Sequence, residues 1–147
     1  MKKIIAVVIG SLGIMSGAMA ATSGADRLDA QITDGYNEIA PLTRSINLAQ
    51  TGTLTAIAAR DGFIKQDFDF TVSSNVVLGL IDDAEGNRLG VIAGSNKGYN
   101  VFTGSSVGGS VSSCGKQVAK DVGDLAASEV TEDNLDLDNA NGCNREL

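Results

Sequence analysis

Side chains of the common catalytic kinds are scarce in this sequence. It contains no histidine, so a Ser-His-Asp triad, a Cys-His pair or a histidine-based metal site cannot be assembled. Ser113 and Lys116 match the S-x-x-K pattern, in which a lysine can activate a serine, but the companion S-D-N and K-T-G strings are missing. The 18 acidic residues could supply paired carboxylates, yet their number alone selects no pair. We therefore predict a protein that is not an enzyme.

An acidic, Asn-rich stretch near the C-terminus is the best candidate for a metal site. Asp136 and Asp138, together with Asp133 or Asn134, offer the hard oxygen atoms that calcium prefers. No register of this stretch supplies both the glycine and the glutamate of an EF-hand loop. Residues 121–138 include seven acidic and no basic side chains, a composition that is also typical of a solvated face or tail. Calcium is the single cofactor that this pattern suggests.

Two cysteines, Cys114 and Cys143, predict a single disulfide formed in an oxidising compartment. Closing a loop of about 30 residues stabilises the fold by roughly 3.5 kcal/mol in the chain-entropy model. Two free thiols are the alternative, since a closed zinc site needs more ligands than two thiols provide without histidine.

The first twenty residues resemble a removable export signal. Lys2 and Lys3 precede the apolar run from Ile4 to Met15, and Ala18-Met19-Ala20 has the small residues that signal peptidase requires. The run is shorter than the roughly 20 residues that a membrane span needs. We predict a signal peptide over residues 1–20, cleaved after Ala20, with an uncleaved N-terminal anchor as the alternative.

The mature chain would be one acidic domain, residues 21–147. Removing two lysines changes the net charge from −7 to −9. Such a surface repels nucleic acid and anionic membranes, so we expect neither as a partner, and we expect a mature form that does not span the membrane.

Two helices are predicted from apolar residues at helical spacing. The first begins near Pro41, which suits a first helical turn, and ends near Asp61-Gly62. Its apolar positions are Leu42, Ile46, Ala49, Leu54, Ile57 and Ala58. The second covers Lys116 to about Glu129 and has Val118, Val122 and Leu125 as its stripe.

Strands are predicted between these helices. Residues 67–72 alternate with period two and place Phe68, Phe70 and Val72 on one face. Residues 76–81 and 88–93 flank a polar loop and predict a β-hairpin, while residues 99–102 predict a fourth strand. These apolar residues are most simply core, although an edge strand could also pair with a neighbouring molecule.

The Gly- and Ser-rich residues 104–113 predict a flexible connection. Together the elements predict an α+β fold, with an N-terminal helix on a small antiparallel sheet, a C-terminal helix and a disulfide-tied tail.

This order of elements over residues 36–147 resembles the globular domain of type IV pilins, especially the type IVb class. In that family the first cysteine of the pair opens a helix and the second lies near the C-terminus, as Cys114 and Cys143 do here. The prepilin glycine–glutamate signature is absent, since no acidic residue precedes Asp26. The resemblance implies a filament subunit, but ordinary cleavage after Ala20 would remove the segment with which pilins polymerise.

Together these features predict an exported, non-catalytic protein of the periplasm or cell surface that acts through protein–protein contact. A filament subunit, an adhesin or an accessory to one would fit, as would self-assembly. Two alternatives stay open, namely a small periplasmic binding or inhibitor protein and a minor hydrolase that uses carboxylates.

Overall fold

The computed structural model of the chain describes residues 27–43, 46–57, 59, 61–120 and 125–146. The predicted signal peptide, residues 1–20, and its cleavage point lie outside this part of the chain. The described residues form β-strands and short 3-10 helices, with no α-helix among them. No helix in these residues is long and apolar enough to cross a membrane.

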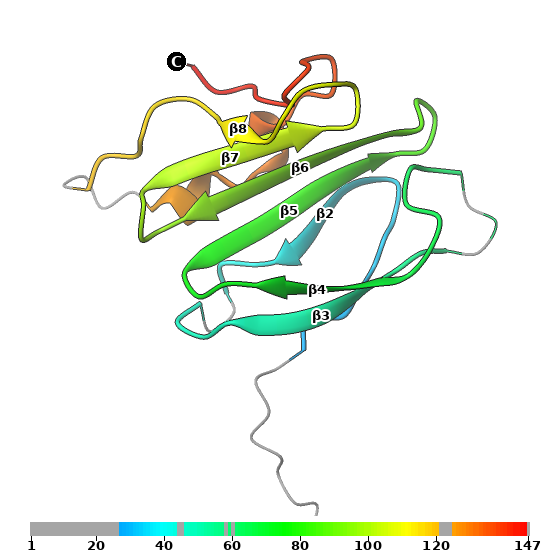
Figure 1. Cartoon of the computed structure of the whole chain (residues 1–147), viewed down its shortest axis with the longest axis horizontal. Helices are drawn as coiled ribbons and strands as arrows, with labels where there is room; N and C mark the ends of the chain where they lie inside the picture. The colour runs from blue at the N-terminus through cyan, green and yellow to red at the C-terminus, as the bar shows by residue number, and fades with distance from the viewer. Residues whose placement is uncertain (1–26, 44–45, 58, 60, 121–124, 147) are drawn as a thin grey trace, which may run out of the picture.

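The strands form two sheets of unequal size (Figure 1). The larger is antiparallel with the order β2-β5-β6-β7-β8, and the smaller has the order β1-β3-β4, with β1 parallel and β4 antiparallel to β3. The elements are β1 (Ala30–Gln31), β2 (Gly35–Ala40), β3 (Gln50–Thr55), β4 (Phe68–Val72), β5 (Val76–Asp83), β6 (Arg88–Ser95), β7 (Asn100–Ser105), β8 (Ser112–Ser113), η1 (Ala126–Glu129) and η2 (Glu132–Asn134).

The predicted strands are confirmed. β4 covers the alternating Phe–Val segment, β5 and β6 form the predicted hairpin, and β7 corresponds to the predicted fourth strand. In the hairpin turn, Asn87 adopts a φ of 49°, in the left-handed region that asparagine tolerates. The Gly86 amide donates a hydrogen bond of 2.8 Å to Asp83, which fixes the turn between the two strands.

The predicted α+β class is wrong, and the first helix is the larger error. The described part of residues 41–58 contains turns followed by β3 instead of a helix. In β3, Gln50, Gly52 and Leu54 are buried, and Thr51, Thr53 and Thr55 alternate with them. Because threonine is branched at Cβ, it favours this extended backbone over a helix. The period-two threonines therefore override the helical spacing of the apolar residues.

The predicted C-terminal helix is also absent from the described residues of its range, which contain only η1 and, before it, an irregular segment. The Cys114 amide donates to the Val101 carbonyl, and the Val118 amide donates to the Tyr99 carbonyl, both at 2.8 Å. These bonds hold the chain against the edge of β7, where the two amides bond to that strand and to the residue before it instead of forming the i to i−4 bonds of a helix.

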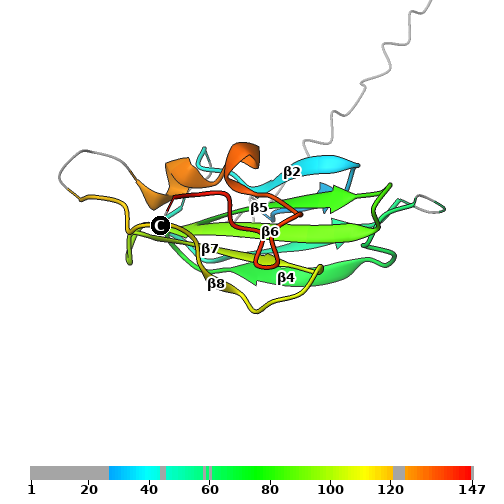
Figure 2. The same cartoon turned by 90° about the horizontal axis from the view of Figure 1, so that it is seen from above.

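Two hydrophobic cores lie on opposite faces of the larger sheet. One packs Val77, Ile92 and Val101 against C-terminal residues such as Ala126 and Val130. The other lies between the larger sheet and the smaller one and includes Ile32, Ile39, Leu54, Ile64 and Leu80. Figure 2 accordingly shows the 3-10 helices on one side of β5, β6 and β7, and β4 on the other. The larger sheet is thus the middle layer of the molecule.

Candidate functional site

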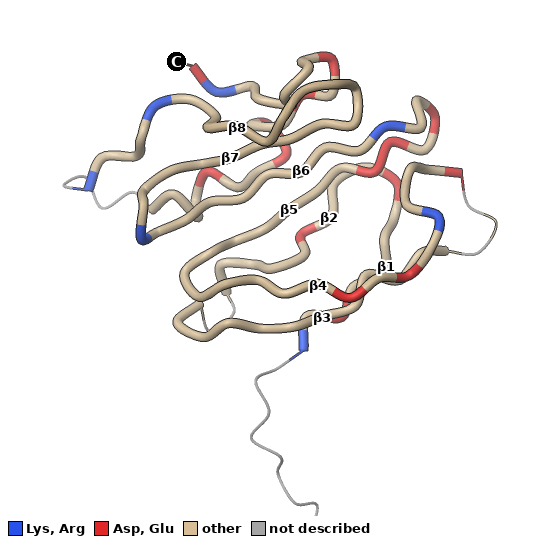
Figure 3. Tube along the Cα trace, in the orientation of Figure 1, with Lys and Arg blue, Asp and Glu red and all other residues tan. Residues whose placement is uncertain are grey.

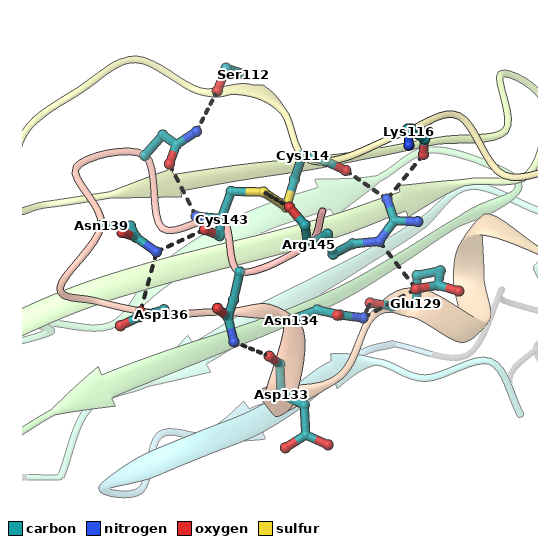
Figure 4. Close-up of a disulfide and its surroundings, with 12 residues drawn as sticks. Ser112, Cys114, Lys116, Glu129, Asp133, Asn134, Asp136, Asn139, Cys143 and Arg145 are labelled. Carbon is teal, nitrogen blue, oxygen red and sulfur yellow. Dashed lines mark hydrogen bonds and ion pairs between the residues drawn. A yellow bond between two sulfur atoms is a disulfide. The ribbon is translucent and has the colours of Figure 1, made fainter. Parts of the chain in front are cut away.

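The predicted disulfide between Cys114 and Cys143 is confirmed (Figure 4). Its Cα atoms are 5.3 Å apart, and Cys114 is fully buried in the core beside Val101 and Val118. Cys143 forms a bridge pairing with Leu135. The bond thus ties the chain after β8 to the C-terminal tail, and it is consistent with folding in an oxidising compartment.

Arg145 reinforces this attachment. Its side chain is only 13% exposed and forms an ion pair of 3.1 Å with Glu129. Its guanidinium also donates to the carbonyl oxygens of Cys114, at 2.6 Å, and of Lys116, at 3.3 Å. Three separate segments therefore meet at one cation, as Figure 4 shows. Arg145 therefore has a structural role, because its charge-assisted bonds hold the end of the chain to the residues around Cys114 and to Glu129.

Residues 125–146, here called the C-terminal strap, cover one face of the larger sheet. The strap crosses β6 where that strand has glycines. The Ala126 carbonyl and the Val130 side chain lie over Gly94, and Leu135 and Leu137 lie over Gly90. From β2, the Tyr36 hydroxyl donates a hydrogen bond of 3.1 Å to the Val130 carbonyl. A side chain at either glycine would occupy the space of the strap.

The three acidic residues of the calcium candidate do not converge. Asp138 forms an ion pair of 2.9 Å with Arg88, and Asp136 accepts hydrogen bonds from the Asp138 amide and the Asn139 side chain. Asp133 is exposed on η2, where its main-chain carbonyl accepts from Asn144. In the part of the chain that the structure describes, no three His, Cys, Asp or Glu side chains are grouped to hold a metal ion.

Arg88 joins this loop to the β5–β6 hairpin. It lies between Asp138 and Asp83, with ion pairs of 2.9 Å to both. Hydrogen bonds to these two carboxylates raise the pKa of Arg88, and the Gly86 amide, followed by Arg88, lowers the pKa of Asp83. The acidic residues here thus fix loops to one another.

The S-x-x-K pair lies beside the disulfide. Ser113 ends β8, and the Lys116 amide donates to the Glu146 carbonyl. Between these two residues lies Cys114, and the main chain on both sides of it is held by strand pairing and by Arg145. Both residues lie in the described part of the chain, and the Ser113 hydroxyl forms no hydrogen bond with the Lys116 ammonium.

An apolar groove opens on the opposite face of the larger sheet from the strap. It has a volume of about 370 Å³ and is lined by Phe63, Leu89, Val91, Gly104, Ser105, Ser106, Gly109 and Val111. Phe63 is 44% exposed and Val111 is 74% exposed. Phe102, which is 38% exposed, shares the face of Gly104 because the two lie two residues apart on β7.

The groove lies in an uncharged part of an acidic protein. Residues 98–115, which form β7, β8 and the loop between them, include no Lys, Arg, Asp or Glu. Figure 3 shows this run as a continuous tan tube between blue segments. Residues 104–113 were predicted to be a flexible connection, but they include the end of β7 and all of β8, and the prediction gave no groove here. The exposed Val107 and Val111, placed within an uncharged run, were the available signal.

Comparison with protein-family models, with curated proteins and with solved structures gives no match for this chain. The resemblance to type IVb pilins stays a prediction. Its remaining basis is the pair of cysteines, because the helices that it implied are absent from the described residues.

Proposed function

We propose that this is an exported, non-catalytic protein that acts outside the cytoplasm through protein–protein contact. A subunit of a surface filament, an adhesin or an accessory to one are the forms that we favour. The disulfide between Cys114 and Cys143 supports an extracytoplasmic location, and the leader pattern of residues 1–20 supports export by signal peptide.

The observation that carries the proposal is the apolar groove. Exposed apolar patches with a polar rim are typical of interaction sites on soluble proteins. The aliphatic side chains of Leu89, Val91 and Val111 line this groove with Phe63, together with two serines and two glycines. The absence of charge along residues 98–115 lowers the desolvation cost of covering this surface.

The experiment is site-specific photocrosslinking in cells that naturally produce the protein. A photoreactive phenylalanine replaces Val111, in the groove, and in a matched control it replaces Asp133, which is exposed on η2 on the strap side. We expect a discrete crosslinked protein from position 111 and none from position 133. Fractionation of the same cells, with N-terminal sequencing, should give a mature chain that starts at Ala21 outside the cytoplasm. Failure of both positions to crosslink, in exported and oxidised protein, would contradict the proposal.

A further inference from the structure

Among the edge strands of the part of the chain that the structure describes, β4 is the one best suited to pair with another strand. β1 and β8 have two residues each. β2 has a register irregularity between Glu38 and Ala40, and Glu38 alone among its residues is exposed. β4 has five residues in regular pairing with β3, and Phe68, Asp69 and Thr71 are exposed. Short strands and bulges protect sheet edges. β4 has neither feature, and its single charged residue is Asp69.

The hydrogen bonds of β3 show which backbone groups of β4 face outward. The Thr51 and Thr55 carbonyls accept from the amides of Leu28 and Ile32, on the β1 side of β3. Since successive residues of a strand direct their backbone groups to opposite sides, Gln50, Gly52 and Leu54 face β4. Their partners in register are Val72, Phe70 and Phe68. The N–H and C=O groups of Asp69 and Thr71 therefore point away from the sheet.

We propose that a second copy of this chain pairs with the outer edge of β4, antiparallel, with the twofold axis at Phe70. This inference rests on the proposed function, for which it names one partner. In this register Asp69 lies opposite Thr71 of the second copy, and Thr71 lies opposite its Asp69. Both residues face outward, so each of these pairs exchanges two backbone hydrogen bonds. The result is one continuous sheet of six strands.

Charge selects this register over its neighbours. A shift that centres the axis on Asp69 would place two carboxylates directly opposite each other, which is destabilising. A shift to Thr71 would place β4 residues beyond the end of the partner's strand, with Phe68 opposite Ser74. The register centred on Phe70 uses all five residues of β4 and opposes no two acids. Self-pairing is therefore compatible with an acidic chain at this edge.

The same register covers the exposed aromatic ring of β4. Phe68 is 46% exposed although its side chain shares a face with Phe70 and with the buried Val72. In the dimer, Phe68 lies opposite Val72 of the second copy, and the two Phe70 residues are neighbours. Aromatic and β-branched pairs across strands are among the favourable ones. The face that is polar in the monomer, with Asp69 and Thr71, stays polar in the dimer.

Sedimentation equilibrium of the mature, oxidised protein tests the proposal. We expect a reversible species of twice the monomer mass. Thr71→Asp places an acid opposite Asp69 twice by symmetry and should raise the dissociation constant about 30-fold. The swap D69T/T71D restores an acid opposite a threonine and should restore the dimer. The matched control is Thr51→Asp, which adds the same charge on the same face at the neighbouring strand and should change the constant less than about 3-fold.

Thermal melting monitors folding of each variant, and Thr71→Pro, which removes an outward N–H, replaces Thr71→Asp if that variant does not fold. A wild-type protein that is monomeric at millimolar concentration would overturn the dimer, as would a Thr71→Asp variant that associates like the wild type. Photocrosslinking from position 111 is read separately in the same variants. A monomer that still crosslinks to another protein would refute this dimer and leave the proposed function standing.

Discussion

Replacing Gly94 by alanine tests whether the strap rests directly on β6. A Cβ atom at Gly94 would lie 2.2 Å from the Ala126 carbonyl oxygen and 2.8 Å from Cγ2 of Val130. Normal contacts between heavy atoms are about 3.5 Å. The nearest atom belongs to the backbone of the strap, so relief requires that the strap itself moves outward by about 1 Å.

The expected loss of stability is about 2–3 kcal/mol, the upper part of the range for overpacked sites. An outward movement also strains two bonds near this point, from the Ala127 amide to Asn96, at 2.9 Å, and from the Tyr36 hydroxyl to Val130. For a domain of this size the melting temperature should fall by roughly 10 °C. Thermal and urea unfolding of the oxidised protein, followed by circular dichroism, measure the change.

Two further glycines provide controls. At Gly90 the nearest atom to a new Cβ is the end of the Leu137 side chain, at 2.4 Å, which can rotate away, so Gly90→Ala should cost about 1 kcal/mol. At Gly98 the nearest atom is Nδ2 of Asn100, at 3.3 Å, so Gly98→Ala should change stability by less than about 0.5 kcal/mol. If Gly94→Ala were as stable as Gly98→Ala, the strap would not lie where this reasoning places it.

Three other outcomes are expected. Replacing both Cys114 and Cys143 by serine should lower the free energy of unfolding by roughly 3.5 kcal/mol, measured in urea, because the loop of about 30 residues is no longer closed. Burial, with smaller contributions from Glu38 and Glu132, raises the pKa of Tyr36 above 10.0. The stability that this neutral side chain contributes is therefore present below pH 10 and should be lost as pH rises through the folded-state pKa. Melting curves recorded at increasing pH should show this alkaline decline in the wild type and a flatter decline in Tyr36→Phe. Calcium should leave the melting temperature and the calorimetric baseline unchanged, because Asp138 is engaged by arginine; a calorimetric titration with measurable heat would contradict this.

The strands between residues 67 and 102 were predictable because one signal dominated there. In β4 the apolar residues alternate with Asp69 and Thr71, and in β5 and β6 two apolar runs flank a turn with Gly86-Asn87. Period-two alternation and turn residues act locally. The disulfide was predictable for a different reason, since two cysteines in a chain with a predicted export signal leave one pairing.

The helices were wrong because helical spacing of apolar residues is a weak signal when the intervening residues favour another backbone. Between Leu54 and the preceding apolar residues lie β-branched threonines at alternate positions, and these fit a strand. In the C-terminal range the deciding interactions are not local. Val118 is buried as its spacing predicts, but its amide bonds to Tyr99, nineteen positions earlier in the sequence, and no pattern within the segment itself records that bond.

The strap covers one face of the larger sheet, and the apolar groove opens on the opposite face. Its irregular backbone can pack on the larger sheet because Gly90 and Gly94 have no side chains to occupy that space, and the disulfide and Arg145 hold its C-terminal end. That face is therefore filled by the chain itself. On the opposite face, the described residues leave the apolar groove open beside β6 and β7, and the smaller sheet has β4 at one edge. We expect a partner that leaves the strap in place to bind the groove or to pair with β4, and variants at Val111 and Thr71 distinguish these two surfaces.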